Sequence, residues 1–345
     1  MLPTPERVRR NRRWSASLAL AAAVGAAALA WSLVPGPTLF AILLSAALGV
    51  GAAVYRNGTR RTRKRIELLK EPFPPAWEGI LAGRVAFYRR LGEAEKARFR
   101  RMVFIFLREK PIHGAGFTVD EVSRVLVAAS AVIPVFGFSD WEYDMLDEIV
   151  LRPESFDTSD EARTGLYTGA VGLVGASGLM NGLMVLSDPE LRRGFEGRGE
   201  KHNVGIHEFA HLVDKAKGRI DGVPAGLPPG LFRPWLRVMR EMIRQGSLGA
   251  ADFPDYGFTS DEEFFAVASE YFFEAPGEME QKHPELYGLL ERVYRQDTGS
   301  LFQGLVERVS RPRRRRIRGN APCPCGSGLK YKRCCGRGKR PTPRP

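Results

Sequence analysis

The stretch His207-Glu208-Phe209-Ala210-His211 constrains this 345-residue chain more than any other. The pattern H-E-x-x-H is useful only on a helix, where residues four apart share a face and both imidazoles can reach one metal ion. The glutamate can then take a proton from a water that the metal has made acidic. The alternative is an ordinary buried helix with two satisfied histidines. The chain has only five histidines, so two at this spacing around a glutamate favour a metal site.

Two histidines do not complete a catalytic zinc site, which needs a third protein ligand and an open position. A third histidine six residues past the second is absent, because Lys217 stands there. The remaining choices are acids of a later helical stretch, namely Asp261, Glu262, Glu263 and Glu270. Glu263 and Glu270 lie seven residues apart and share a helix face, so periodicity does not choose between them. Their apolar neighbours predict a buried helix, in which a carboxylate needs a partner such as a metal.

Two uncharged apolar runs, residues 14–34 and 38–55, stand near the N-terminus, and each approaches the ~20 residues that cross a bilayer. Basic residues precede the first run and follow the second, and such residues stay on the cytoplasmic side. We therefore expect a hairpin, anchored in a bacterial inner membrane by residues 14–55, with Pro35-Gly36-Pro37 as its external turn. Both termini and the catalytic domain are then cytoplasmic. A signal peptide cleaved near Ala28-Leu29-Ala30 is the alternative.

Between the two ends lies a body of ordinary hydrophobicity without cysteine, which excludes a disulfide-stapled secreted scaffold. Thr118 with Glu121 predicts a capping box, and Ser187 predicts another helix cap. Residues 165–177 are glycine-rich and predict a loop with a weak strand. We expect an α+β fold, mostly helical with a small sheet. Periodicity predicts helices over 76–91, 93–107, 118–129, 188–195, 235–245, 261–273 and 284–309, and strands over 148–151 and 183–186.

All four cysteines lie in the tail, as Cys323, Cys325, Cys334 and Cys335, in the pattern C-x-C-x8-C-C. Four thiolates between glycine turns, in a segment too small to fold unaided, indicate a structural zinc ion. A reactive dithiol tail is the alternative. The tail resembles the SEC-C motif, which occurs at the end of the bacterial translocation ATPase and contacts partner proteins or ribosomes.

The tail is also strongly basic, with 14 Lys/Arg and no acid over residues 308–345. We expect this segment to contact an acidic partner, which is ribosomal RNA, an acidic protein or anionic lipid. A solvated basic tail is the alternative. A nucleic-acid-binding role for the whole chain would rest on charge alone.

A family resemblance covers the residues from about Pro74 to Val309. It is carried by residues 207–214, by Gly222-Val223-Pro224 and by the stretch 263–273, which reads EFFAVASEYFF. These resemble the MtfA family of zinc peptidases, whose active site is similar to that of the lethal-factor-type metalloproteases, a gluzincin arrangement in a zincin-like domain.

The resemblance implies a role for each matching position. His207, His211 and Glu263 would hold the catalytic zinc ion. Glu208 would be the general base and later proton donor, and Tyr256 would donate to the oxyanion. Asp214 either orients a ligand histidine by a hydrogen bond, or is an ordinary capping residue in contact with solvent.

These patterns divide the chain into a membrane-anchoring hairpin (1–70), a peptidase domain (71–310) and a basic tether with a zinc motif (311–345). The expected function is zinc-dependent hydrolysis of a peptide or protein substrate, with one catalytic and one structural Zn²⁺. The alternative is a catalytically weak adaptor that docks to the ribosome or translocation machinery through its tail.

Overall fold

The computed structural model describes residues 2–33, 37–153, 182–197, 201–216, 218, 220–246, 254–302, 320, 323 and 329–333. Two compact units divide the chain. The first contains Met1–Pro74 and Arg100–Arg108, and the second contains Pro75–Phe99 and Glu109–Pro345.

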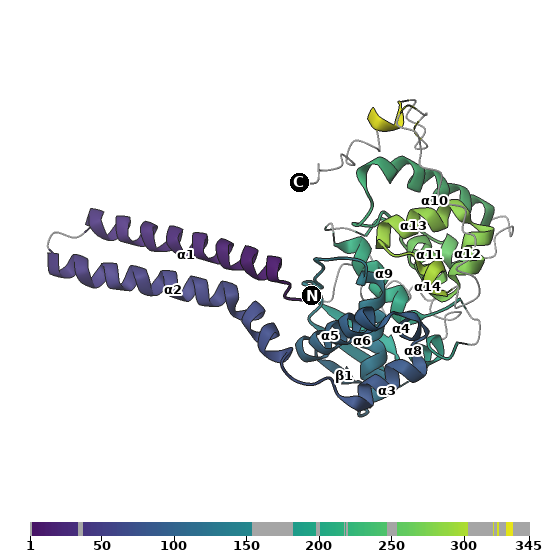
Figure 1. Cartoon of the computed structure of the whole chain (residues 1–345), viewed down its shortest axis with the longest axis horizontal. Helices are drawn as coiled ribbons and strands as arrows, with labels where there is room; N and C mark the ends of the chain where they lie inside the picture. The colour runs from purple at the N-terminus through teal and green to yellow at the C-terminus, as the bar shows by residue number, and fades with distance from the viewer. Residues whose placement is uncertain are drawn as a thin grey trace, which may run out of the picture. The chain divides into compact units, whose positions relative to one another are not determined.

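The first unit contains two long antiparallel helices, α1 (Pro5–Leu33) and α2 (Pro37–Leu68) (Figure 1). Both run past the apolar stretches into their basic flanks. Within the described residues, one stretch, Ala41–Leu68, is long and apolar enough to cross a membrane. The expected external turn falls largely on residues 34–36, outside the described part of the chain. Large apolar side chains lie exposed on both helices, among them Trp14, Leu18, Leu20, Val24, Ile42 and Leu48.

Small residues let α1 and α2 approach closely. A methyl group added to Gly51 would lie 3.0 Å from the carbonyl oxygen of Ala19, and one added to Gly58 would lie 2.6 Å from Oγ of Ser15. The side-chain amide of Asn11 donates to the carbonyl of Gly58 over 3.1 Å. Close backbone approach and polar contacts of this kind hold helices together where surrounding lipid removes the hydrophobic driving force.

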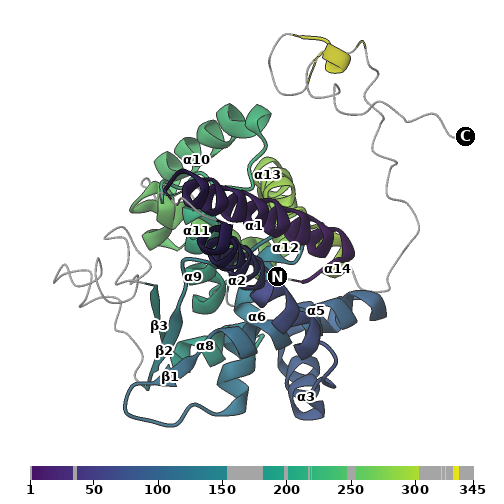
Figure 2. The same cartoon turned by 90° about the vertical axis from the view of Figure 1, so that its left-hand side faces the viewer.

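The sheet of the second unit is small and parallel, in the order β1-β2-β3. Strands β2 (Glu148–Arg152) and β3 (Leu183–Ser187) confirm the two predicted strands, and β1 (Ile112–Gly114) was not predicted. Figure 2 shows the three strands side by side, with helix α8 (Asp188–Gly194) following β3. The glycine-rich residues 165–177 lie outside the described residues.

Several helices begin or end differently from the prediction. The first body helix is interrupted at Val85, and the last is interrupted at Arg295, whose φ of 55° closes the preceding helix in the left-handed conformation. The predicted cap Thr118 was wrong, because Asp120 accepts the hydrogen bond from the Ser123 amide instead. Ser187 does cap α8, by accepting from the Glu190 amide.

The remaining elements are helical. They are α3 (Pro75–Arg84), α4 (Ala86–Arg90), α5 (Glu93–Glu109), α6 (Glu121–Val135), α9 (Val204–Lys215), α10 (Phe232–Gly246), α11 (Asp261–Glu274), α12 (Pro276–Lys282), α13 (Pro284–Tyr294) and α14 (Thr298–Phe302), with 3₁₀ turns η2 (Pro229–Leu231), η3 (Asp255–Phe258) and η4 (Tyr331–Arg333). The body is therefore mostly helical with a small sheet, as the sequence predicts.

Helix α11 forms the centre of the core. Phe265 and Phe272 of this helix stack on Tyr294 of α13 with ring centroids 6.0 and 5.7 Å apart. The Tyr294 hydroxyl lies 2.6 Å from Oγ of Ser269, which satisfies two buried polar groups. Each buried aromatic ring stabilises the fold by about 2–3 kcal/mol. This packing holds α11 rigidly beside α9, the helix that carries the histidine motif.

Candidate metal centre

Helix α9 carries both motif histidines. Its N-terminus is capped by Asn203, whose side-chain oxygen accepts the Ile206 amide over 3.1 Å. Every residue of the helix is buried, so this short segment is stabilised by packing rather than by intrinsic propensity. Because His207 and His211 are one turn apart, their rings approach each other, with the two Nε2 atoms 3.1 Å apart.

Glu263 of α11 completes a cluster with the two histidines. Its carboxylate oxygens lie 3.2 Å from Nε2 of His207 and 3.4 Å from Nε2 of His211. Ligand atoms bound at the zinc distances of about 2.0–2.2 Å to one tetrahedral ion are themselves about 3.3–3.6 Å apart. The observed separations nearly match these tetrahedral edges, and two imidazoles with one carboxylate are a common donor set for zinc. Glu263 is 29% exposed, so a fourth position is within reach of solvent.

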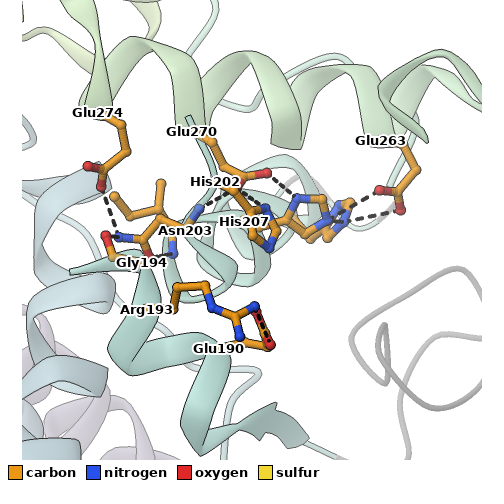
Figure 3. Close-up of polar contacts among 11 residues, drawn as sticks. Glu190, Arg193, Gly194, His202, Asn203, His207, Glu263, Glu270 and Glu274 are labelled. Carbon is orange, nitrogen blue, oxygen red and sulfur yellow. Dashed lines mark hydrogen bonds and ion pairs between the residues drawn. The ribbon is translucent and has the colours of Figure 1, made fainter. Parts of the chain in front are cut away.

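Glu270, the other carboxylate on this face of α11, lies on the far side of His207. Its Oε1 is 2.8 Å from Nδ1 of His207, and its Oε2 accepts the Asn203 amide over 2.5 Å and lies 2.8 Å from Nδ1 of His202. Figure 3 shows Glu263, Glu270 and Glu274 projecting from one side of α11 toward α9. A carboxylate on Nδ1 fixes the tautomer of His207 and leaves Nε2 free to bind a metal.

The charges of this cluster are strongly coupled. Burial alone would raise the pKa of Glu270, but hydrogen bonds from His202 and His207 lower it to about 2. Burial would likewise raise the pKa of Glu263, and hydrogen bonds from both motif histidines hold it well below its ordinary value. Burial opposes a charge on His207, yet Glu263 and Glu270 raise its pKa well above the usual range. The partly exposed Glu263 and the buried Glu270 thus favour positive charge at His207, which a metal ion bound to its Nε2 would also supply.

Glu208 sits on α9 beside the cluster and is 1% exposed. Burial raises its pKa to about 7. One carboxylate oxygen, Oε2, has no hydrogen-bond partner among the described residues. A carboxylate with a pKa near neutrality and an unmade hydrogen bond next to a metal site is suited to accept a proton from water.

Asp214 does not take the orienting position that the sequence left open. Its Oδ2 accepts the backbone amides of Asp221 and Gly222 over 2.9 and 2.7 Å. The indole of Trp235 donates to the Gly222 carbonyl over 2.8 Å. Asp214 therefore fixes the loop between α9 and α10, whereas Glu270 orients a motif histidine.

Sequence reasoning missed three members of this network, His202, Asn203 and Glu274. Asn203 donates its side-chain amide to Glu274 over 2.9 Å and to the Gly194 carbonyl over 3.2 Å. The only signal for Asn203 was its place just before an apolar helix, where a capping residue is expected. Spacing could have suggested Glu274, which lies eleven residues after Glu263 and shares its face.

Two sets of predicted residues are described only in part. Tyr256 lies in the backbone turn η3, whose Gly257 packs against Val267 of α11, and its side chain lies outside the described residues. In the tail, the Cys323 amide donates to the Leu329 carbonyl over 2.8 Å. Cys325, Cys334 and Cys335 lie outside the described residues.

Comparison with known families assigns the body of the chain. The model of the glucose-regulated metallopeptidase family M90 matches residues 58–295. The chain belongs to family M90. Its tail, residues 320–337, matches the SEC-C motif.

The relatives of this chain include both named and uncharacterized proteins. An uncharacterized protein of Synechocystis is 28% identical over 74% of this chain and 96% of its own length. Mlc titration factor A of Cronobacter sakazakii is 28% identical over 65% of this chain and 87% of its own length. Mlc titration factor A of Escherichia fergusonii is 28% identical over 65% of this chain and 86% of its own length. The resemblance to the MtfA family is confirmed, and the chain is a metallopeptidase of that family.

Proposed function

We propose that this M90 protein is a zinc-dependent peptidase that is anchored in the bacterial inner membrane and faces the cytoplasm. The observation that carries the proposal is the convergence of His207, His211 and Glu263, with ligand atoms all within 4.8 Å of one another. An adaptor with a vestigial site would have no need to keep this donor set beside a buried glutamate. The cluster supports a zincin-like site in which these three residues hold the metal.

Each residue then has a distinct task in hydrolysis. Zinc, when bound, supplies a Lewis acid beside the water and the peptide carbonyl. Glu208 accepts the proton of the attacking water and returns it to the leaving amine. Tyr256 donates to the oxygen that becomes negative as the carbonyl is attacked. Glu270 and Asn203 keep the His207 ring in place, so that Nε2 stays directed at the metal.

The ends of the chain supply location and recruitment in this proposal. The hairpin over residues 1–70 anchors the peptidase body, residues 71–310, and the tether with the SEC-C motif, residues 311–345, holds a second zinc ion through Cys323, Cys325, Cys334 and Cys335. The basic tail then recruits ribosomal RNA, an acidic protein or anionic lipid. The match to the SEC-C motif and the close packing of α1 with α2 support this organisation.

The decisive experiment is the Glu208→Gln variant, measured for metal content and for cleavage of a peptide mixture by mass spectrometry. Glutamine preserves the shape but cannot accept the proton, so zinc should be retained while cleavage falls strongly. Tyr256→Phe should also retain zinc and lower the rate by roughly 10²–10³-fold, the effect of one lost oxyanion donor. Undiminished cleavage by Glu208→Gln would contradict the proposed mechanism.

A further inference from the structure

Three buried polar atoms on helix α9 have no hydrogen-bond partner among the described residues. They are Oε2 of Glu208, Nδ1 of His211 and Nζ of Lys215. Residues four and seven apart on a helix share a face, so Lys215 lies on the same side as His211 and Glu208. Each buried polar group without a partner costs free energy, and a cluster of them on one face indicates that something else makes those bonds.

The proposed peptidase mechanism uses Glu208 and His211 but leaves Lys215 unexplained. Lys215 is only 5% exposed, and burial lowers the pKa of its ammonium group. Buried lysines are normally paired with a carboxylate, because an isolated charge away from water is strongly unfavourable. No acid of the described residues fills that role for Lys215. The described residues thus supply no anion for Lys215, and its amine is left to bind one from outside them.

The position of Lys215 on the helix limits where that anion lies. Along α9 it follows His211 by four residues and Glu208 by seven, which corresponds to a rise of about 6 and 10 Å. An extended peptide advances about 3.3–3.6 Å per residue. The distance along α9 from the metal ligands to Lys215 thus equals that spanned by one to three residues of an extended substrate.

We propose that Lys215 binds a carboxylate of the peptide substrate and thereby determines which peptides the metal centre accepts. The proposal rests on the peptidase function proposed above. The carboxylate has two possible sources, the C-terminal α-carboxylate of a short peptide or the side chain of an acidic residue near the cleaved bond. Both present the same acceptor to the ammonium group, and matched peptides distinguish them.

The experiment uses the full-length protein in detergent and matched pairs of N-acetylated peptides. The parent is the best-cleaved C-terminally amidated peptide from the mixture used above. One pair compares its free acid with its amide, and the others compare Glu with Gln at each position within three residues of the cleaved bond. Cleavage is measured for the wild type, Lys215→Met and the control Lys282→Met, which removes an exposed lysine far along the chain.

The wild type should cleave the carboxylate-bearing member of one pair with a kcat/KM about 10–100-fold higher, the effect of one charge-assisted hydrogen bond. Lys215→Met should abolish that preference, so that its kcat/KM values for the two members of each pair agree within about twofold. Lys282→Met should keep the preference. The proposal is overturned if the wild type shows no preference in any pair, or if Lys215→Met retains it.

A binding measurement separates this proposal from the peptidase function itself. Zinc-loaded Glu208→Gln is titrated by calorimetry with acetyl-tetraalanine as free acid and amide, and with acetyl-Ala-Ala-Glu-Ala amide and its Gln counterpart. Tighter binding of a carboxylate form, lost on adding Lys215→Met, supports the role of Lys215 even if the wild type cleaves nothing. Equal binding of all four peptides overturns it. Should Lys215→Met fail to fold by circular dichroism, Lys215→Gln takes its place, because it keeps a polar side chain of similar length.

Discussion

The carboxylate of Glu270 lies 2.8 Å from Nδ1 of His207, on the opposite edge of the ring from Nε2, which faces Glu263. Two glutamates of one helix thus contact the same imidazole through different nitrogens. Glu263 is positioned to bind the metal, and Glu270 is positioned to hold the ring that binds it. This division assigns different consequences to two substitutions that look equivalent in the sequence.

Glu263→Gln should lose most of its affinity for zinc, because it removes an anionic ligand. Glu270→Gln should bind zinc about 10–100-fold more weakly, since it only loosens the orientation of His207. Competition with a chelator measures both affinities, and Glu208→Gln serves as the control that retains zinc. The assignment is wrong if Glu270→Gln is free of zinc while Glu263→Gln keeps it.

Glu274 should make stability depend on pH in a direction opposite to that of ordinary carboxylates. Burial raises its pKa from 4.5 to about 7. The folded state therefore binds a proton more tightly than the unfolded state, and the free energy of unfolding falls as pH rises from about 4.5 through 7. At pH 8 the charged Glu274 lowers the free energy of unfolding by up to about 3 kcal/mol, which corresponds to the difference between a pKa of 4.5 and one of about 7.

Glu274→Gln is uncharged at every pH and still accepts the hydrogen bond from Asn203. Urea unfolding of the metal-depleted variant should match the wild type near pH 4.5 and show higher stability at pH 8. Glu280→Gln, the same change at an exposed site of α12, should follow the wild-type curve. A Glu274→Gln curve parallel to the wild type across this range would show that the carboxyl is not buried in solution.

Gly222→Ala should destabilise both the loop and the metal centre. Gly222 has a φ of 69°, and an added Cβ would lie 2.2 Å from the Asp261 carbonyl oxygen at the start of α11. The expected cost is about 1–2 kcal/mol for the left-handed backbone and a further amount for the clash. Zinc affinity should fall as well, because Glu263 follows Asp261 by two residues.

Gly116→Ala is the matched control for this loop. Gly116 has a φ of 81°, and an added Cβ would meet nothing within 4 Å. It should therefore show the backbone cost alone, with unchanged zinc affinity. Equal losses of unfolding free energy in the two variants would mean that the contact with Asp261 contributes nothing.

Deletion of residues 312–345 should remove about one equivalent of bound zinc and leave peptide hydrolysis intact, because we propose that the four cysteines form a site of their own. Metal analysis and a cleavage assay on the purified, folded protein measure the two properties separately. Loss of hydrolysis together with the tail would show that the tail and the peptidase body do not act as independent modules.

A reporter that is active only in the periplasm should give no signal when fused after Arg65, because basic residues flank both ends of the hairpin. A fusion within the external turn, residues 35–37, should give a strong signal. The hairpin prediction fails if the fusion after Arg65 is active, or if the mature protein begins near Trp31.

The sequence alone determined the features that depend on local spacing. H-E-x-x-H predicted the helix with two histidines on one face, and the apolar residues around Glu263 and Glu270 predicted a buried second helix. Strands β2 and β3 were visible as short apolar runs. Strand β1 was missed because three residues between Pro111 and Ala115 are too few to show a period.

Tertiary structure decided what spacing could not. Glu263 and Glu270 share a face with a period of seven, so only the packing of α11 beside α9 assigns one to Nε2 and the other to Nδ1. The same packing turned Asp214 toward the loop and buried Lys215 with no hydrogen-bond partner in the described part of the chain. The local sequence determines which face of its helix a side chain occupies. The residue that this side chain contacts belongs to a segment dozens of residues away. That partner is chosen by the burial of aromatic side chains such as Phe265 and Tyr294, which requires the whole fold.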